Sequence, residues 1–534
     1  MYKVLDLFSG AGGLSLGFEQ TGKFKLVAAV ENNINARKTY EFNHPNTKIL
    51  GDICSIDFDK LKKDIGEIDV IIGGPPCQGF SNANRQKKQA ISINNKLVKY
   101  YFKAIRKMNP KMFVMENVTA IQSKSHKFYY SDDPDLDEQT PMKLFQYDEI
   151  VIGGNENIDL DEFIINIDRN MNHLLIDKEL FSMLKKINNR SQKMDDVSKE
   201  KLEKFITKNN IKIQKKLEKE IENKINLNDC FSEYILKNLQ CIQKNGLEHS
   251  VLNSIKENIQ NIIEFNDMIL SNNEIVTNHI IVDKYSVSLD NKIIASVKSC
   301  SVIKYIKYII KDKYVYVDGE LNAATFGVPQ KRSRYILIGK NNQFKNEMKL
   351  QLPKAIVSED RYSTVFDAIS DIEVYPPALN VSSPPIKLNK TTIEDKLLNL
   401  KDSDFLYNHI ITKSREKSLN RFEILKEGQN FHDLSEKFKD TYAEPKKTQN
   451  SIYKRLKYDE PCDTVTNARK SMWIHPTQNR AISIREVARL QTFPDSFVFI
   501  GTKDSQYQQI GNAVPPIMAK KIAEQILKYI ENEE

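Results

Sequence analysis

A cysteine held between prolines and glycines is a residue of this chain that is well placed for chemistry. Cys77 lies in the run Gly73 to Ser81, which reads Gly-Gly-Pro-Pro-Cys-Gln-Gly-Phe-Ser and follows the strand-like run Ile68 to Ile72. Because prolines cannot donate backbone hydrogen bonds, a central strand must end there and present the cysteine on a rigid loop. Such a cysteine can be a nucleophile or an inert buried residue at a tight turn. This stretch alone leaves both interpretations open.

A carboxylate follows another predicted strand. The apolar run Met112 to Met115 leads directly into Glu116-Asn117-Val118. A glutamate at the end of a buried strand is rare unless it is paired or functional. Because strand ends of a doubly wound sheet converge on one crevice, Glu116 is expected on the same side of the sheet as Cys77.

A glycine-rich turn near the N-terminus predicts an adenosine-type cofactor. The strand Val4 to Leu7 runs into the turn Phe8 to Gly13, where a ligand can lie against bare backbone at a helix N-terminus. The strand Leu26 to Val30 ends in Glu31, about 20 residues further on, where a carboxylate accepts hydrogen bonds from ribose hydroxyls. The turn departs from the Gly-x-Gly-x-x-Gly spacing that cradles a pyrophosphate, which favours S-adenosylmethionine.

A third strand end carries Asp52, in the run Gly51-Asp52-Ile53. In a doubly wound sheet this carboxylate would reach the same crevice and the adenine amino group of a cofactor. It would equally serve as a cap for the helical segment that follows. Both interpretations stay open.

The elements that position these side chains alternate between strand and helix. A helical pattern that includes Leu14 and Phe18 follows the first strand, and another that ends at Asn109-Pro110 lies between the strands that precede Cys77 and Glu116. The alternation predicts an α/β fold with a doubly wound, Rossmann-like sheet.

Composition excludes several classes of protein. The 534 residues are 40% hydrophobic and 28% charged, and we find no apolar run long enough to cross a bilayer. The N-terminus lacks the zones of a signal peptide, so a cytoplasmic protein is expected. Six widely separated cysteines without a Cys-x-x-Cys pair argue against structural zinc and a disulfide framework, and no metal is expected.

Six sequence blocks together resemble the DNA (cytosine-5) methyltransferase family, of the prokaryotic restriction-modification type. They occur in the family's order and cover residues 1 to about 121, 313–340 and 465–534, roughly half of the chain. The blocks are Asp6 to Gly13, Gly74 to Ser81, Glu116 to Val118, Gly327 to Arg334, Arg485 to Pro494 and Gly511 to Pro516.

The resemblance implies methyl transfer from S-adenosylmethionine to carbon 5 of a cytosine flipped out of a specific duplex DNA sequence. The Cys77 thiolate would add to carbon 6, and Glu116 would hold the exocyclic amine and N3. Arg334 would bind the O2 oxygen, and Arg332 would brace the site. The implied cofactor pocket consists of Phe8, Ser9, Gly10, Gly12, Gly13, Glu31, Asp52, Ile53, Pro76, Leu97, Asn512 and Ala513.

The resemblance also implies partners and leaves alternatives. The chain would act as a monomer on double-stranded DNA, release S-adenosylhomocysteine and protect host DNA from a separately encoded restriction endonuclease. One alternative is methylation of RNA, as in a branch of the family that acts on transfer RNA, although the large recognition interval favours duplex DNA. Another is a DNA-binding or regulatory protein that has kept the fold and lost the chemistry, although every presumed catalytic position is filled.

The main departure from the family is the interval between Glu116 and Gln330, which contains 213 residues instead of a few tens. Helical spacing at Leu217, Ile221 and Ile225 predicts a mainly helical insertion. It would serve DNA contact, partner binding or structural support, of which structural support is preferred. The expected boundaries are 1–121 (catalytic domain), 122–312 (insertion), 313–340 (catalytic domain continued), 341–464 (irregular target-recognition domain) and 465–534 (segment completing the catalytic domain).

A basic segment with interleaved aromatic residues lies towards the end of the chain. Between Lys446 and Arg480 there are eight basic and three acidic residues, with Tyr453, Tyr458 and Trp473 among them. This mixture suits phosphate contacts and stacking on bases, although a run of charges is more often a solvated face.

Overall fold

The structure, a computed structural model, divides into two compact units. The described residues of one unit are Ile93 and those of 127–301, and the other unit consists of the described residues of 1–76, 94–126 and 302–531. The structure describes residues 1–76, 93–124, 126–132, 142–192, 196–227, 229–247, 251–344, 348–389, 397, 400–442 and 445–531.

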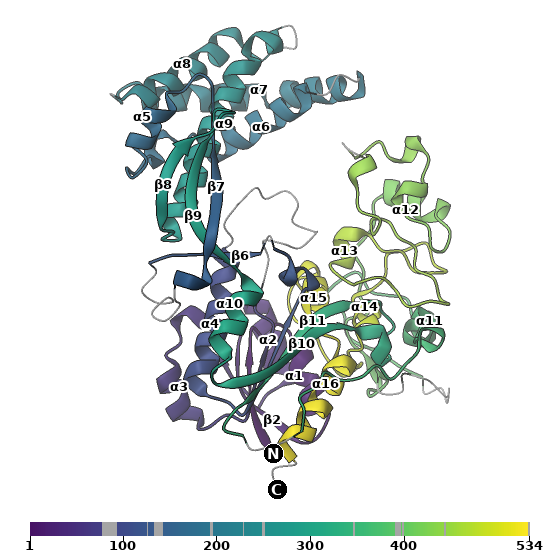
Figure 1. Ribbon diagram of the computed structural model, residues 1–534. Helices are drawn as coiled ribbons and strands as arrows, with labels where there is room; N and C mark the ends of the chain where they lie inside the picture. Colours follow the sequence, from purple (N-terminus) through teal and green to yellow (C-terminus); the bar gives the residue numbers. More distant parts are fainter. Residues whose placement is uncertain are drawn as a thin grey trace. The chain divides into compact units, whose positions relative to one another are not determined.

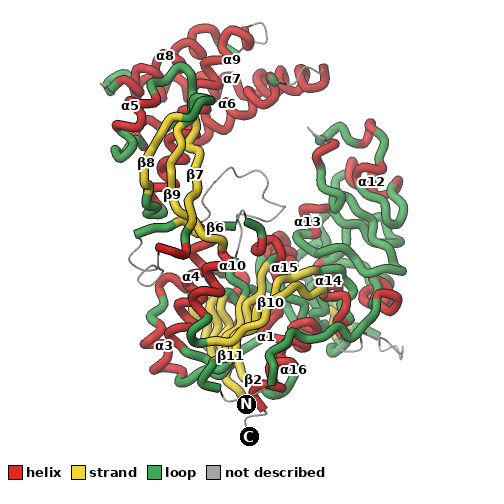
Figure 2. Tube along the Cα trace, in the orientation of Figure 1, coloured by secondary structure: helices red, strands yellow, loops and turns green. Residues whose placement is uncertain are grey.

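A seven-stranded sheet is the centre of the larger unit, as far as the structure describes it (Figures 1 and 2). The strand order is β10-β11-β5-β4-β1-β2-β3, parallel from β5 to β3 and antiparallel at β11 and β10. This order confirms the doubly wound α/β fold, and its switch point lies between β1 and β4, where such sheets bind ligands. The strands are β1 Tyr2–Leu7, β2 Phe24–Val30, β3 Lys48–Leu50, β4 Val70–Gly73, β5 Met112–Asn117, β10 Tyr314–Asn322 and β11 Ser333–Asn341.

Helices cover both faces of this sheet. On one face, α1 (Gly13–Glu19) packs against α16 (Pro516–Ile530) so closely that a Cβ on Gly17 would lie 2.3 Å from that of Ala519. On the other face, Phe102 of α4 (Ile93–Met108) contacts Phe113 of β5. The remaining helices around the sheet are α2 Ile34–Asn43, α3 Phe58–Ile65, α10 Val302–Ile310 and α15 Lys503–Asn512.

The segment between β11 and α14 consists mostly of loops in its described part (Figure 2). Arg455 is buried there and donates hydrogen bonds to the backbone carbonyls of Leu425 and His475. These bonds satisfy carbonyl oxygens that a sheet or helix would otherwise pair with backbone amides. The short elements are α11 Val365–Ile369, β12 Ile386–Lys387, β13 Phe405–Leu406, α12 Glu416–Ile424, α13 Ala468–Ser471 and α14 Ile484–Leu490.

The stacking role expected for the aromatic residues of the basic segment is wrong for two of them. Tyr453 and Trp473 are buried, with 4% and 1% of their surface exposed. They belong to apolar clusters because loops without regular secondary structure need large side chains to build a core. Among the basic residues, Arg455 is buried as well, whereas Lys446 and Lys470 are exposed.

The unit 127–301 combines helices with a sheet that helical spacing alone did not indicate. Strand β9 (Ile293–Ser301) pairs antiparallel with β6 (Lys127–Tyr129), β7 (Gln146–Gly153) and β8 (Val282–Val287). A separate apolar core lies between the sheet and its helices. Leu217 is buried in this core, whereas Ile225 lies just beyond its helix and is exposed. The helices are α5 Leu160–Ile165, α6 Lys178–Ser191, α7 Asp196–Lys224, α8 Cys230–Asn245 and α9 Leu252–Thr277.

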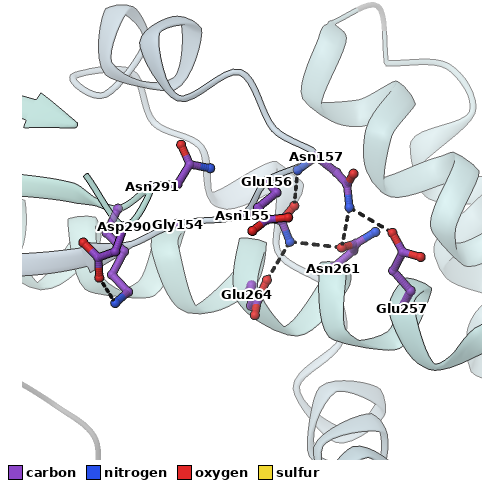
Figure 3. Close-up of a pocket in the computed structure, with 10 residues that line it drawn as sticks. Gly154, Asn155, Glu156, Asn157, Glu257, Asn261, Glu264, Asp290 and Asn291 are labelled. Atoms are coloured by element: carbon purple, nitrogen blue, oxygen red, sulfur yellow. Dashed lines mark hydrogen bonds and ion pairs between the residues drawn. The ribbon is translucent and has the colours of Figure 1, made fainter. Parts of the chain in front are cut away.

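A polar pocket of about 400 Å³ lies within this unit (Figure 3). Its amides and carboxylates bond to one another: Asn155 donates to Asn261 and Glu264, and Asn157 donates to Glu257. These bonds join the loop after β7 to α9, so the lining polar groups have a structural explanation.

Candidate active site

The glycine turn after β1 is packed tightly at one end and open in the middle. A Cβ on Gly12 would lie 2.5 Å from His44 Nε2, and one on Gly13 would lie 2.4 Å from the Val514 carbonyl oxygen. At Gly10, by contrast, a Cβ would meet nothing within 4 Å. Phe8 and Gly10 also have φ values of 59° and 56°, so the turn is held in a left-handed backbone conformation. A ligand therefore has room to approach the backbone at Gly10.

Glu31 holds this turn in place. Its Oε2 accepts a hydrogen bond from the Gly10 amide at 2.8 Å, and its Oε1 accepts one from the Asn33 amide at 2.7 Å. A carboxylate has further lone pairs, so both oxygens can still accept from ribose hydroxyls. The side chain thus joins the turn to the start of α2, a contact that spacing in the sequence did not predict.

Two buried oxygens beside the turn have no hydrogen-bond partner among the described residues. They are Asp6 Oδ1 and Ser9 Oγ. The other Asp6 oxygen accepts from Ser15 Oγ at 2.5 Å, and Ser15 also bonds to the Tyr40 hydroxyl. Burial, together with the nearby charge of Glu31, raises the pKa of Asp6 to about 8. Since buried polar atoms normally have partners, the turn, its open side and these oxygens fit a polar ligand such as S-adenosylmethionine.

Asp52 caps the short helix that follows it. Its Oδ1 accepts a hydrogen bond from the Cys54 amide at 3.0 Å at the start of the 3₁₀ helix Ile53–Ser55. The cap interpretation is therefore confirmed. Asp52 is exposed and Ile53 is buried. The contact between Asp52 and adenine stays a prediction.

Glu116 and Arg334 form an ion pair at the end of β5. Arg334 Nε lies 2.9 Å from Glu116 Oε1, and both side chains are largely buried. The pair forms because β11 runs antiparallel beside β5, with Ile336 opposite Glu116. Burial lowers the pKa of Arg334, against the opposing effect of the Glu116 charge. The carboxylate also lies against the chain before Cys77, since a Cβ on Gly74 would be 2.9 Å from Glu116 Oε2.

Cys77 itself lies outside the described residues. The described chain before it stops at Pro76, which is half-buried, and resumes at α4, where Leu97 is also half-buried. The structure therefore gives the position of the chain that leads to the cysteine, and its contact with Glu116, but no geometry for the thiol.

Arg332 is a brace that contacts backbone carbonyls. It is 1% exposed, and its guanidinium donates to the carbonyls of Val465, Gly511 and Ala513 at 2.7, 2.9 and 3.0 Å. Burial lowers its pKa strongly. The side chain thereby joins the start of β11 to the end of α15, where Asn512 is exposed and Ala513 is buried.

Gln330 also holds distant segments together, a role that the sequence did not predict. It is fully buried, donates to Gln491 Oε1 at 2.9 Å and accepts from the Val465 amide at 2.8 Å. The feature of the sequence that could have indicated this role is its place in the Gln-Lys-Arg-Ser-Arg run, two residues before Arg332. Together Gln330 and Arg332 connect their own sequence block, Gly327 to Arg334, to the blocks Arg485 to Pro494 and Gly511 to Pro516.

Two classes of feature were not found within the described ranges. No group of three or more His, Cys, Asp or Glu side chains is arranged to hold a metal ion there. No helix in the described part of the chain is long and apolar enough to span a membrane.

Comparison with known proteins places this arrangement in one family. A model described as C-5 cytosine-specific DNA methylase matches residues 2–132 and 305–528. The type II methyltransferases M.DdeI of Desulfomicrobium norvegicum and M1.HphI of Haemophilus parahaemolyticus are each 25% identical over 99% of this chain, and the matches cover 89% and 87% of those proteins. An E. coli crystal structure described as a prophage-encoded DNA modification methyltransferase shares the fold, with a TM-score of 0.55, 18% identity and coverage of 99% of this chain and 100% of that one.

Proposed function

This chain belongs to the C-5 cytosine-specific DNA methylase family, and on that premise we propose that it methylates carbon 5 of a cytosine in a specific duplex DNA sequence, using S-adenosylmethionine. The observation that carries the proposal is the ion pair between Glu116 and Arg334, which lies against Gly74, three residues before Cys77. A carboxylate and a guanidinium at a strand end, beside the chain that leads to a cysteine, suit a polar base better than a sugar or a protein side chain.

The difficulty of the reaction explains why a cysteine is needed. Carbon 5 of cytosine is a poor nucleophile, so electron density must first be pushed into the ring. The Cys77 thiolate forms a bond to carbon 6, and the electron pair of the 5,6 double bond becomes available at carbon 5. A free cysteine has a pKa of about 8.5, so its surroundings must favour the thiolate.

Glu116 and Arg334 would stabilise the ring as the thiol adds. Arg334 holds Glu116 Oε1, which orients the carboxyl group for the exocyclic amine and N3, while the guanidinium would reach the O2 oxygen. Preorganised groups of this kind are worth about 10²–10³-fold each in rate. Arg332, whose hydrogen bonds to the described residues go to backbone carbonyls, would position the strand that carries Arg334.

S-adenosylmethionine, when bound, supplies the methyl group from its sulfonium. The donor would leave as S-adenosylhomocysteine once the methyl group has passed to carbon 5, which the Cys77 adduct would make nucleophilic. Loss of the carbon 5 proton to a base then restores the double bond and expels the Cys77 thiolate. The turn residues Phe8, Ser9, Gly10, Gly12 and Gly13 would hold the cofactor, with Glu31 on the ribose. Asp52, Ile53, Pro76, Leu97, Asn512 and Ala513 would complete the pocket.

The target base must leave the duplex to reach this crevice. We assign recognition of the DNA sequence to the loop-rich interval 341–464, and the insertion 122–312 to structural support. The type II relatives favour a role in protecting DNA against a separately encoded endonuclease. The chain would act as a monomer, since one copy contains every proposed site residue.

The test is tritiated methyl transfer to duplex DNA and to transfer RNA in parallel, followed by digestion and identification of the methylated nucleoside. The expected product is 5-methylcytosine in DNA with wild-type protein and none with Cys77→Ser, which should still bind S-adenosylmethionine. Methyl transfer to RNA and not to DNA would show that the enzyme is an RNA methyltransferase and would contradict the proposed substrate. Methyl transfer by Cys77→Ser at the wild-type rate would contradict the mechanism.

A further inference from the structure

Asn117, the residue after Glu116, makes a buried bond to the chain that leads to Cys77. Its Nδ2 donates to the Pro75 carbonyl oxygen at 2.8 Å, across 42 positions of sequence. Its Oδ1 accepts from the Val118 amide at 2.9 Å, and the side chain is 4% exposed. Both ends of this amide are therefore used.

The Pro75 carbonyl needs such a partner because of the sequence around it. Strand β4 pairs with β5 only as far as Gly73, opposite Met115. Pro75 and Pro76 cannot extend the sheet, since neither has an N–H group. The segment thus leaves the sheet after Gly73, four residues before Cys77, with carbonyl oxygens to satisfy, and a side chain from β5 bonds to one of them.

The same segment is fixed on its other side by Glu116. A Cβ on Gly74 would lie 2.9 Å from Glu116 Oε2, so the backbone there passes directly against the carboxylate. Neighbouring residues of one strand therefore contact neighbouring residues of the segment: Glu116 contacts Gly74, and Asn117 binds Pro75.

We propose that Asn117 is a positioning residue for the methyl-transfer reaction, which holds the chain before Cys77 in register with Glu116. The inference rests on the proposed function. Without the bond, the segment would keep its prolines but lose its polar attachment to β5. Misplacement of a reacting group by about 1 Å costs on the order of 100-fold in rate, which is the loss expected here.

Two substitutions remove the donor in different ways. Asn117→Asp keeps the shape and the acceptor for Val118 but cannot donate to Pro75 when ionised. Asn117→Ala removes the donor without adding a buried charge, so it serves if the aspartate variant folds poorly. The matched control is Asn272→Asp, because Asn272 is also buried and donates to a backbone carbonyl, that of Ile167, within the unit 127–301.

The measurement is the single-turnover rate of covalent adduct formation with duplex DNA that contains 5-fluorocytosine, with S-adenosylmethionine and DNA affinities measured separately. Both Asn117 variants should form the adduct about 100-fold more slowly, with both affinities within about threefold of wild type, and Asn272→Asp should match the wild-type rate. If Asn117 only stabilised the fold, its substitution would lower the affinities together with the rate, instead of the rate alone.

Three results would overturn or redirect the inference. Wild-type adduct rates in both Asn117 variants would contradict it, while leaving the proposed function intact. Loss of cofactor binding together with adduct formation in both variants would also contradict it, since Asn117 would then support the fold as a whole. Absence of any adduct with wild-type protein would instead contradict the proposed function.

Discussion

Residues 127–301, called the insertion below, differ sharply in charge from the rest of the chain. Residues 127–301 contain 23 basic and 30 acidic residues, a net charge of −7, whereas the rest of the chain contains 56 basic and 41 acidic residues, a net charge of +15. DNA is a polyanion, and neutralisation of its phosphates supplies much of the affinity of a DNA-binding protein. The excess of positive charge that binding to DNA requires therefore lies outside residues 127–301, which carry a net negative charge.

Both units contain buried oxygens without a described partner, and they differ in where these oxygens lie. In the insertion they are amide oxygens on helices, those of Asn188, Asn210 and Asn272. Other amides and carboxylates of the insertion, such as Asn155 and Glu264, bond to one another. In the catalytic unit, Asp6 and Ser9 retain buried oxygens without a described partner, and Glu116 is paired beside the segment before Cys77. Polar networks in which every group has a hydrogen-bond partner stabilise a fold, whereas polar groups that lie unpaired or charged at the end of a strand are typical of a functional site.

Among substitutions that distinguish the two units, Arg334→Ala is expected to have the largest effect on the rate of methyl transfer. The substitution removes the partner of Glu116 and the proposed ligand of O2, so the single-turnover rate of methyl transfer should fall about 10²–10³-fold. The control is Lys185→Ala, which breaks the Lys185 and Asp267 ion pair of the insertion, 2.7 Å long, and should change the rate less than twofold. Comparable losses in both variants would remove the distinction between the units.

A smaller effect is expected from the pH dependence of stability, through Asp6. Its folded-state pKa is raised from 3.8 to about 8, so between these values the folded protein keeps a proton that the unfolded chain has lost. Stability therefore falls as pH rises through this window, by up to about 1.4 kcal/mol per pH unit, and Asp6→Asn abolishes that fall. The melting temperature of the variant should rise relative to wild type between pH 5 and pH 8.

The measurement follows the cofactor-free protein by thermal melting. The transition of the catalytic unit can be identified because S-adenosylmethionine raises its midpoint. Parallel pH curves for Asp6→Asn and wild type in that transition would show that Asp6 is ionised in the folded protein. The melting transition of the insertion should not respond to Asp6→Asn, so it serves as an internal control.

The smallest effect is expected from removal of the insertion itself. The chain leaves the catalytic unit at His126 and returns at Val302, whose amide donates to the His126 carbonyl at 3.0 Å, so a short glycine-serine linker can close the gap. Excision of 127–301 removes seven net negative charges and no proposed site residue. S-adenosylmethionine affinity should stay within about threefold, and the salt dependence of DNA binding should be unchanged. Loss of cofactor binding on isothermal titration would mean that the catalytic unit depends on the insertion.

The sequence predicted best those elements that glycine and proline delimit. The strand before Cys77, the strand that contains Glu116 and the turn from Phe8 to Gly13 were recognisable because local residues stop or precede a strand or permit a turn. Family blocks then assigned expected roles to Arg332 and Arg334. The fold could therefore be predicted wherever local chemistry determines it.

The contacts that complete the site depend on distant parts of the chain and were not predictable. The bond from Asn117 to Pro75 spans 42 positions, and Arg332 binds carbonyls more than a hundred positions away. The burial of Trp473 and the sheet of the insertion likewise follow from packing that no local pattern records. Tertiary contacts decide such features because they satisfy whichever polar and apolar groups the fold brings together.

The central claim is that Cys77 is the nucleophile of this crevice, and one measurement tests it most directly. Wild-type protein is incubated with S-adenosylmethionine and duplex DNA that contains 5-fluorocytosine, and the covalent product is digested and mapped by mass spectrometry. The account predicts one modified peptide, linked to the base through Cys77, and no adduct with Cys77→Ser. An adduct at any other residue, or one that persists in Cys77→Ser, would contradict it.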